Sequence, residues 1–172
     1  MFLITKFKCI TLFLLFLSSV FPSFTVCQVS KLGLRQLGEA LIEVTIFKID
    51  VYRASYFVGK DKFKKPVELL ELIYLRDVKR EHSISGWKEG FKNIDKKRYA
   101  EAIRWIFENT VSVKEKDCFS ILKKSNEVSF YLNNKLIATT KNKRVLEIVH
   151  SPWIGKKPLD DEVKLKLLGK NK

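Results

Sequence analysis

The sequence predicts an α+β domain in which a helical layer covers one face of an antiparallel sheet. Three observations support this prediction. Residues 40–75 alternate in the two-residue period of strands, residues 84–107 change to the three-and-four spacing of amphipathic helices, and residues 118–139 return to short strand-like runs before a final helix. Strands, helices and strands in this order favour a sheet with its helices segregated to one side.

The start of the chain is typical of an export signal. Lys6 and Lys8 precede an apolar run over residues 10–21, which is shorter than the ~20 residues that a membrane-spanning helix needs. We therefore predict an export signal over residues 1–27, one domain over residues 28–172, and a periplasmic location. An uncleaved anchor is the alternative.

Two cleavage positions fit the small residues near the end of this signal, one after Thr25 and one after Cys27. Lipid modification of Cys27 is disfavoured, because Val26 stands where a lipoprotein signal requires a small residue. With Cys9 and Cys27 assigned to the signal, only Cys118 remains in the exported domain. We therefore expect no internal disulfide and a small, buried Cys118 side chain.

The first half of the domain contains three predicted strands. Residues 40–46 and 51–57 form the first two, and Gly59 with the following lysine run marks a turn. The third strand covers residues 67–75 and places Leu70, Leu72 and Tyr74 on one side.

Two amphipathic helices follow, and their apolar faces are rich in aromatic residues. The first repeats at Ile84, Trp87, Phe91 and Ile94, and the second extends from Tyr99 to Phe107. Such faces are more typical of a packed core than of a cofactor site.

The second half of the domain returns to strands over residues 118–122, 128–132 and 136–139. Asn133-Asn134 predicts a tight hairpin between the last two. A terminal helix is opened by the acidic residues 160–162 and closed by Gly169, where a left-handed cap is expected.

The composition restricts the classes of partner. The formal net charge is +14, but the basic residues occur in short runs such as 60–65 and 96–98 rather than in one stripe interleaved with aromatic residues, which argues against a nucleic-acid face. An anionic envelope surface is the alternative partner. With only His82 and His150 as histidines and no phosphate-binding loop, we expect no cofactor and no metal.

Several segments together resemble the bacterial exported branch of the chalcone isomerase-like family. They occur in the family's order and cover nearly the whole domain: Gly38-Glu39-Ala40, residues 47–54, residues 72–77, Trp105-Ile106-Phe107, Asp117, residues 130–134, Trp153-Ile154-Gly155 and Leu167-Leu168-Gly169. The resemblance implies an open-faced sandwich with a ligand cleft between the sheet and the helices.

The resemblance also implies which residues would carry the family's known reaction, in which an arginine and a polar network promote ring closure of a chalcone. Aligned on Val51-Tyr52 and the later motifs, the four polar network positions fall on Phe47, His82, Glu89 and Pro152. None matches the expected residue type. These four residues and Tyr52 are therefore our candidates for the lining of a ligand cleft.

The position of the arginine has two readings. Gly33-Leu34-Arg35 lies 17 positions before Tyr52, as in plant enzymes, whereas aligning Gly38 with the family glycine places Ile42 or Glu43 there. We favour the second reading, in which Arg35 is a loop residue.

Three functions remain open from the sequence. The preferred one is an exported, non-catalytic protein that binds a small apolar or amphipathic ligand in the cleft. The second is an isomerase, an intramolecular lyase with altered chemistry, in which His82 acts as acid or base and Arg35 as the cation. The third is an envelope accessory protein that uses its basic surface.

Overall fold

The fold is built around one six-stranded antiparallel sheet. The computed structural model of the chain describes Cys27 and residues 33–44 and 49–170. The sheet order is β1-β2-β3-β4-β5-β6, so each strand pairs with its neighbours in sequence. The strands are β1 (Arg35–Val44), β2 (Ile49–Lys60), β3 (Pro66–Tyr74), β4 (Cys118–Lys124), β5 (Glu127–Leu132) and β6 (Lys135–Thr140).

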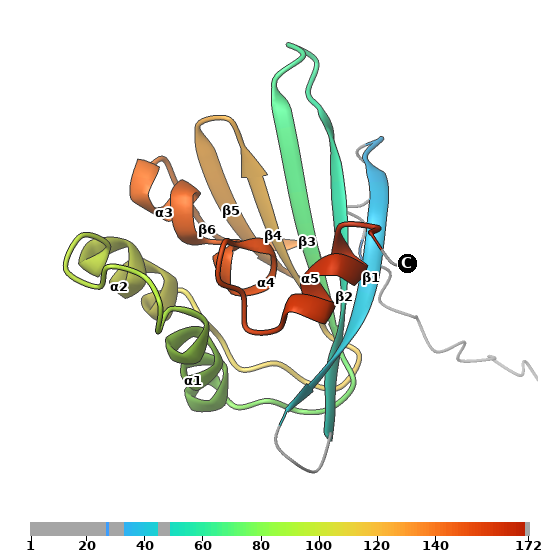
Figure 1. The fold of residues 1–172 in the computed structure, drawn as a ribbon, viewed down its shortest axis with the longest axis vertical. Helices are drawn as coiled ribbons and strands as arrows, with labels where there is room; N and C mark the ends of the chain where they lie inside the picture. Colours follow the sequence, from blue (N-terminus) through green and yellow to red (C-terminus); the bar gives the residue numbers. More distant parts are fainter. Residues whose placement is uncertain (1–26, 28–32, 45–48, 171–172) are drawn as a thin grey trace, which may run out of the picture.

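The helices gather on one face of this sheet, which confirms the predicted α+β architecture (Figure 1). They are α1 (Arg80–Gly90), α2 (Ala100–Glu108), α3 (Lys143–Ile148), α4 (Ser151–Ile154) and α5 (Asp161–Leu167). In the described part of the chain, none of these helices has the length and apolar character needed to cross a bilayer.

The strand predictions are confirmed within a few residues of their ends, although β1 begins five residues before the predicted start, and residues 45–46 of that prediction lie outside the described residues. Asn133 and Asn134 both have positive φ, 49° and 68°, as the predicted tight hairpin requires. The terminal helix is also confirmed. Asp160 accepts hydrogen bonds from the backbone amides of Glu162 and Val163, and Gly169 follows the helix with a φ of 64°.

The helix predictions differ from the structure at three places, one of which is the four-residue helix α4, which was not predicted. The first helix ends at Gly90, so Ile94 lies in the turn that follows. α3 was not predicted, although Asn142 supplies the signal for its start by accepting a hydrogen bond from the Arg144 amide. A six-residue helix presents too few turns for its apolar spacing to stand out.

Two glycines allow the helical layer to approach its neighbours. A Cβ at Gly38 on β1 would collide with the carbonyl oxygen of Lys166 in α5. A Cβ at Gly90 would lie 2.6 Å from Cβ of Pro152, so α1 and α4 pack closely only because this position has no side chain.

The main core lies between the sheet and the helices, because alternate residues of each strand point toward the helical layer. Its sheet side contains Ala54, Leu70, Leu72, Ile121 and Phe130. A smaller apolar cluster occupies the opposite face of the sheet, where Leu69 and Leu122 pack with Val67, Leu34, Phe57 and Tyr131.

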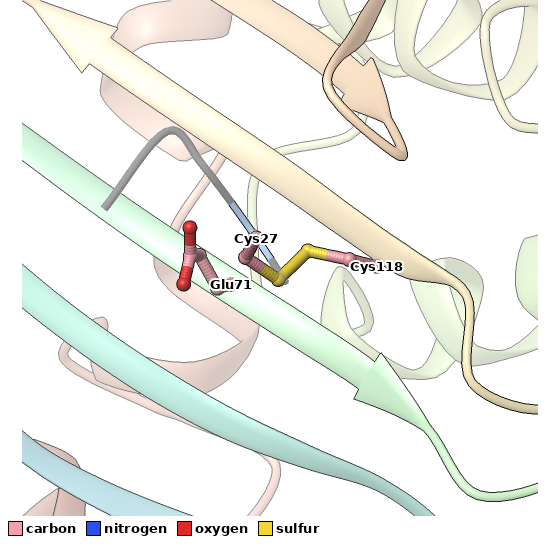
Figure 2. A group of neighbouring side chains, drawn as sticks. All are labelled: Cys27, Glu71 and Cys118. Carbon is pink, nitrogen blue, oxygen red and sulfur yellow. A yellow bond between two sulfur atoms is a disulfide. The ribbon is translucent and has the colours of Figure 1, made fainter. Parts of the chain in front are cut away.

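The expectation of no internal disulfide is wrong. Cys27 is bonded to Cys118 at the start of β4, with their Cα atoms 5.9 Å apart, and both residues are buried. The bond lies on the sheet face opposite the helices (Figure 2). The error followed from counting Cys27 as part of the export signal. The expectation that Cys118 is buried is confirmed.

Candidate ligand-binding site

Aromatic rings fill the space between the sheet and the helices. The ring of Trp87 stacks on Phe91 at a centroid distance of 5.3 Å and meets Trp153 edge-on at 5.2 Å. On the sheet side, Phe130 lies 5.0 Å from Trp105 and 5.3 Å from Phe119. The cleft between sheet and helices, which the family resemblance implies, is thus closed here by ring-to-ring packing.

A hydrogen bond joins the two layers inside this aromatic cluster. Nε1 of Trp153 on α4 donates to the hydroxyl oxygen of Tyr52 on β2 at 3.0 Å. Burial raises the pKa of Tyr52 to about 12, despite the opposing effect of this hydrogen bond. Burial, and then the neighbouring Tyr52 ring at 5.3 Å, also raise the pKa of Tyr74. Both phenols therefore stay neutral at ordinary pH.

A second polar cluster crosses the layers near the β2–β3 hairpin. His150 is 5% exposed, and its Nδ1 and Nε2 lie 3.3 Å from Glu68 Oε2 and from the Ile121 carbonyl oxygen. The Tyr56 hydroxyl donates to Glu68 Oε2 at 3.0 Å, and Lys123 Nζ lies 3.2 Å from Glu68 Oε1. The His150 hydrogen bond, with further help from Lys123, lowers the pKa of Glu68 to about 2.

The polar side-chain atoms of this second cluster all have partners within the protein. A carboxylate and a carbonyl oxygen only accept, so both His150 contacts are hydrogen bonds together only when the ring carries two protons. Sequence reasoning missed this cluster, although the sequence contains one signal of it: Glu68 has the same strand parity as Leu70, Leu72 and Tyr74, which places an acid on the core side. Its partner His150 lies 82 positions away.

An open hollow of about 550 Å³ lies in the helical layer. All its lining residues come from the helices and their connections: Ile94, Tyr99, Glu147, Ile148, Ser151, Ile154, Gly155, Lys156 and Lys164. Its apolar part comes from three isoleucines and the Tyr99 ring. Its volume falls in the ordinary range of small-molecule sites.

The charged groups of the hollow are of both signs. Glu147 accepts a hydrogen bond from the Tyr99 hydroxyl at 2.7 Å and pairs with Arg98 at 3.1 Å, so its charge is already compensated. Lys164 Nζ donates to the Gly155 carbonyl oxygen at 2.7 Å, and the Lys156 side chain is exposed. The two lysines leave a net positive rim, which suits an anionic group.

Two of the predicted cleft residues lie in the interior. Tyr52 takes part in the hydrogen bond with Trp153, and Pro152 is buried against Gly90. Neither lines the hollow. The signal that would have identified the hollow, isoleucines and lysines spread over four separate segments, is visible only once the helices are placed.

The other predicted residues do not converge. Phe47 lies outside the described residues. His82 and Glu89 are both exposed on α1, and Glu89 forms an ion pair with Lys92. Arg35 is exposed at the start of β1, opposite Val58, whereas α1 follows the end of β3 that pairs with Tyr52. Val58 and Tyr52 are about 20 Å apart along β2 at roughly 3.3 Å per residue. Arg35 and His82 therefore lie toward opposite ends of the sheet.

The group of potential metal ligands that the described residues bring together is Cys27, Glu71 and Cys118, whose ligand atoms lie within 4.8 Å of one another. Figure 2 shows the Glu71 carboxylate beside the disulfide. Because the two sulfur atoms are bonded to each other, they do not offer the thiolates that a metal would require.

Comparison with known proteins agrees with this fold. No curated protein matches the sequence. Among solved structures, a fatty-acid binding protein of Arabidopsis thaliana superposes with a TM-score of 0.62 over 79% of this chain and 87% of its own, at 12% sequence identity. A family model described as chalcone isomerase-like matches residues 31–169, and the chain belongs to that family.

Proposed function

We propose that this protein is an exported, non-catalytic binding protein for a small amphipathic molecule with an apolar chain and an anionic head, and that the hollow in the helical layer is its site. The fold relative from Arabidopsis thaliana, a fatty-acid binding protein, supports a ligand of this class. The proposal depends on the hollow itself.

The observation that carries the proposal is the pairing of an apolar floor with a cationic rim. Ile94, Ile148 and Ile154 offer aliphatic surface for a hydrocarbon chain. Lys156 and Lys164 line the same hollow and would meet a carboxylate or phosphate head. Glu147 does not oppose this, because Arg98 and Tyr99 already hold its carboxylate.

The positions of the candidate catalytic groups favour binding over isomerisation. Ring closure of a chalcone requires a cation and hydrogen-bond donors inside one apolar cleft. Here Arg35 and His82 are exposed toward opposite ends of the sheet, and the interior donor Trp153 is already bonded to Tyr52. These residues offer no shared site for acid–base work.

Native mass spectrometry tests the proposal on protein purified from the cell envelope, followed by solvent extraction. We expect an adduct with the mass of a fatty acid or similar amphiphile, released by the solvent. An adduct-free protein that also takes up no saturated fatty acid in titration would overturn the proposal.

The proposal of export has independent support from the disulfide. Cys27 and Cys118 form a buried bond, and such bonds persist in oxidising compartments such as the periplasm. Cleavage after Cys27 would remove half of this bond, so we favour cleavage after Thr25. The intact mass of the periplasmic protein distinguishes the two positions, and a mature chain that begins at Gln28 would contradict this assignment.

A further inference from the structure

The loop between β2 and β3 presents exposed apolar and basic side chains together. Figure 1 shows this hairpin reaching beyond the neighbouring strand connections at the top of the view. At its tip, Phe63 is 69% exposed, the largest value among the exposed large hydrophobic side chains of the described residues. Four exposed lysines surround it: Lys60, Lys62, Lys64 and Lys65.

The loop has a defined shape. Asp61 Oδ1 accepts hydrogen bonds from the backbone amides of Phe63 at 2.8 Å and Lys65 at 2.9 Å. The Lys64 amide donates to the Asp61 carbonyl oxygen at 2.9 Å, and Lys64 has a φ of 61°. These bonds fix the backbone on both sides of Phe63, so the exposure of its ring is a property of the folded loop.

The loop carries a net positive charge, because residues 60–65 contain four lysines and one acid, Asp61. None of the four lysines forms an ion pair with an acid of the described residues, and the carboxylate of Asp61 accepts hydrogen bonds from backbone amides. Lys62 Nζ lies 5.0 Å from the centroid of the Phe63 ring. Cationic and apolar surface are therefore presented together in one small tip.

We propose that this tip docks the protein on an anionic phospholipid bilayer, with Phe63 inserted at the level of the headgroups and the lysines against the phosphates. An anionic surface attracts lysines whatever its chemistry, but an exposed ring is stabilised only where there is apolar material to enter. A bilayer offers both, whereas a polysaccharide or a nucleic acid backbone offers only the charge. This docking surface is separate from the hollow and does not depend on its ligand.

Sedimentation with lipid vesicles tests the charge contribution, using protein purified after export. The vesicles contain phosphatidylcholine either alone or mixed with phosphatidylglycerol. We expect binding only to the mixed vesicles, weakened by salt. The triple variant Lys62→Gln/Lys64→Gln/Lys65→Gln should bind about a hundredfold more weakly, since each lysine near an anionic surface contributes about 1 kcal/mol. A control triple variant of exposed lysines elsewhere, Lys96→Gln/Lys97→Gln/Lys143→Gln, should retain most binding. Equal losses in the two triple variants would overturn the proposal.

Insertion of the ring is tested separately. Phe63→Ala should weaken vesicle binding about tenfold, because burial of an aromatic side chain contributes roughly 1.5–3 kcal/mol. Phe63→Trp should show added quenching by brominated lipid compared with the parent protein, and Leu136→Trp, at a 52% exposed position on β6, should not. Unchanged binding of Phe63→Ala, or no added quenching in Phe63→Trp, would show that any attraction is charge alone and would reject the bilayer as the partner.

Discussion

The carboxylate of Glu68 on β3 lies 3.3 Å from Nδ1 of His150, a buried ring that begins α4. The pair ties the sheet to the helical layer at the end of the molecule near the β2–β3 hairpin. His150 is 5% exposed and the Glu68 side chain 29%, so water screens the pair only partly.

Loss of the Glu68 charge should destabilise the fold. We expect Glu68→Gln to lower the free energy of unfolding by about 1–3 kcal/mol at neutral pH, because the buried His150 ring loses its anionic partner. Urea denaturation measures this. Glu127→Gln is the matched control, since the side chain of its partner Lys124 is 42% exposed and ion pairs so accessible to water contribute about 0–1 kcal/mol.

The same pair predicts a pH dependence. The pKa of Glu68 falls from 4.5 to about 2 on folding, so its stabilising contribution is complete above pH 4.5 and is lost as the pH falls toward 2. Urea denaturation from neutral to acidic pH should show a shallower loss of stability for Glu68→Gln than for the parent protein over this interval. Parallel curves for the two proteins would contradict the assigned ion pair.

Removal of the disulfide should lower the free energy of unfolding more than a substitution at the surface does. The bond closes a loop across 91 positions of sequence, and cross-links of this span commonly stabilise by about 2–4 kcal/mol. We expect that loss in Cys27→Ala/Cys118→Ala relative to the oxidised parent, measured by denaturation. Thiol labelling of the denatured, unreduced protein provides the control: two reactive thiols in the exported parent would mean that the bond does not form.

The close contact of α1 with α4 predicts opposite effects of two similar changes. Gly90→Ala should destabilise by about 1–3 kcal/mol, because the added methyl group would overlap Pro152. A Cβ at Gly86 on the same helix meets nothing within 4 Å, so Gly86→Ala should stabilise by about 0.4–1 kcal/mol. Thermal unfolding of both variants checks this, and a lower midpoint for Gly86→Ala than for Gly90→Ala would be inconsistent with the packing described.

The hydrogen bond between Trp153 and Tyr52 predicts a non-additive pair of variants. Tyr52→Phe leaves the Nε1 donor of Trp153 without its partner and should lower the free energy of unfolding by about 1–3 kcal/mol. Adding Trp153→Phe removes that donor, so the double variant should lose less than the sum of the two single variants. A double-mutant cycle from urea denaturation measures the difference. Strict additivity would mean that the hydrogen bond contributes nothing.

The sequence predicts the strands well and the contacts between distant segments poorly, for a physical reason. Alternation at Leu70, Leu72 and Tyr74 reports which face of a strand is buried, and the Asn133-Asn134 turn reports its own geometry. Neither reports what packs on that face. Glu68 and His150, or Cys27 and Cys118, meet only because the sheet brings distant segments together. The hollow was missed for the same reason.

The most direct test of ligand binding is a titration with a saturated fatty acid of the delipidated protein, compared across three variants by calorimetry. Lys156→Glu reverses the charge of a lysine that lines the hollow, and Ile154→Asp places a charge on the apolar part of its lining. Lys157→Glu is the control, because it reverses the charge of an exposed neighbouring lysine that does not line the hollow. Circular dichroism shows whether each variant remains folded. The account predicts that Lys156→Glu and Ile154→Asp bind the fatty acid at least tenfold more weakly than the parent protein, and that Lys157→Glu binds it with unchanged affinity. Equal affinity in all three folded variants, or no heat of binding in the parent protein, would contradict it.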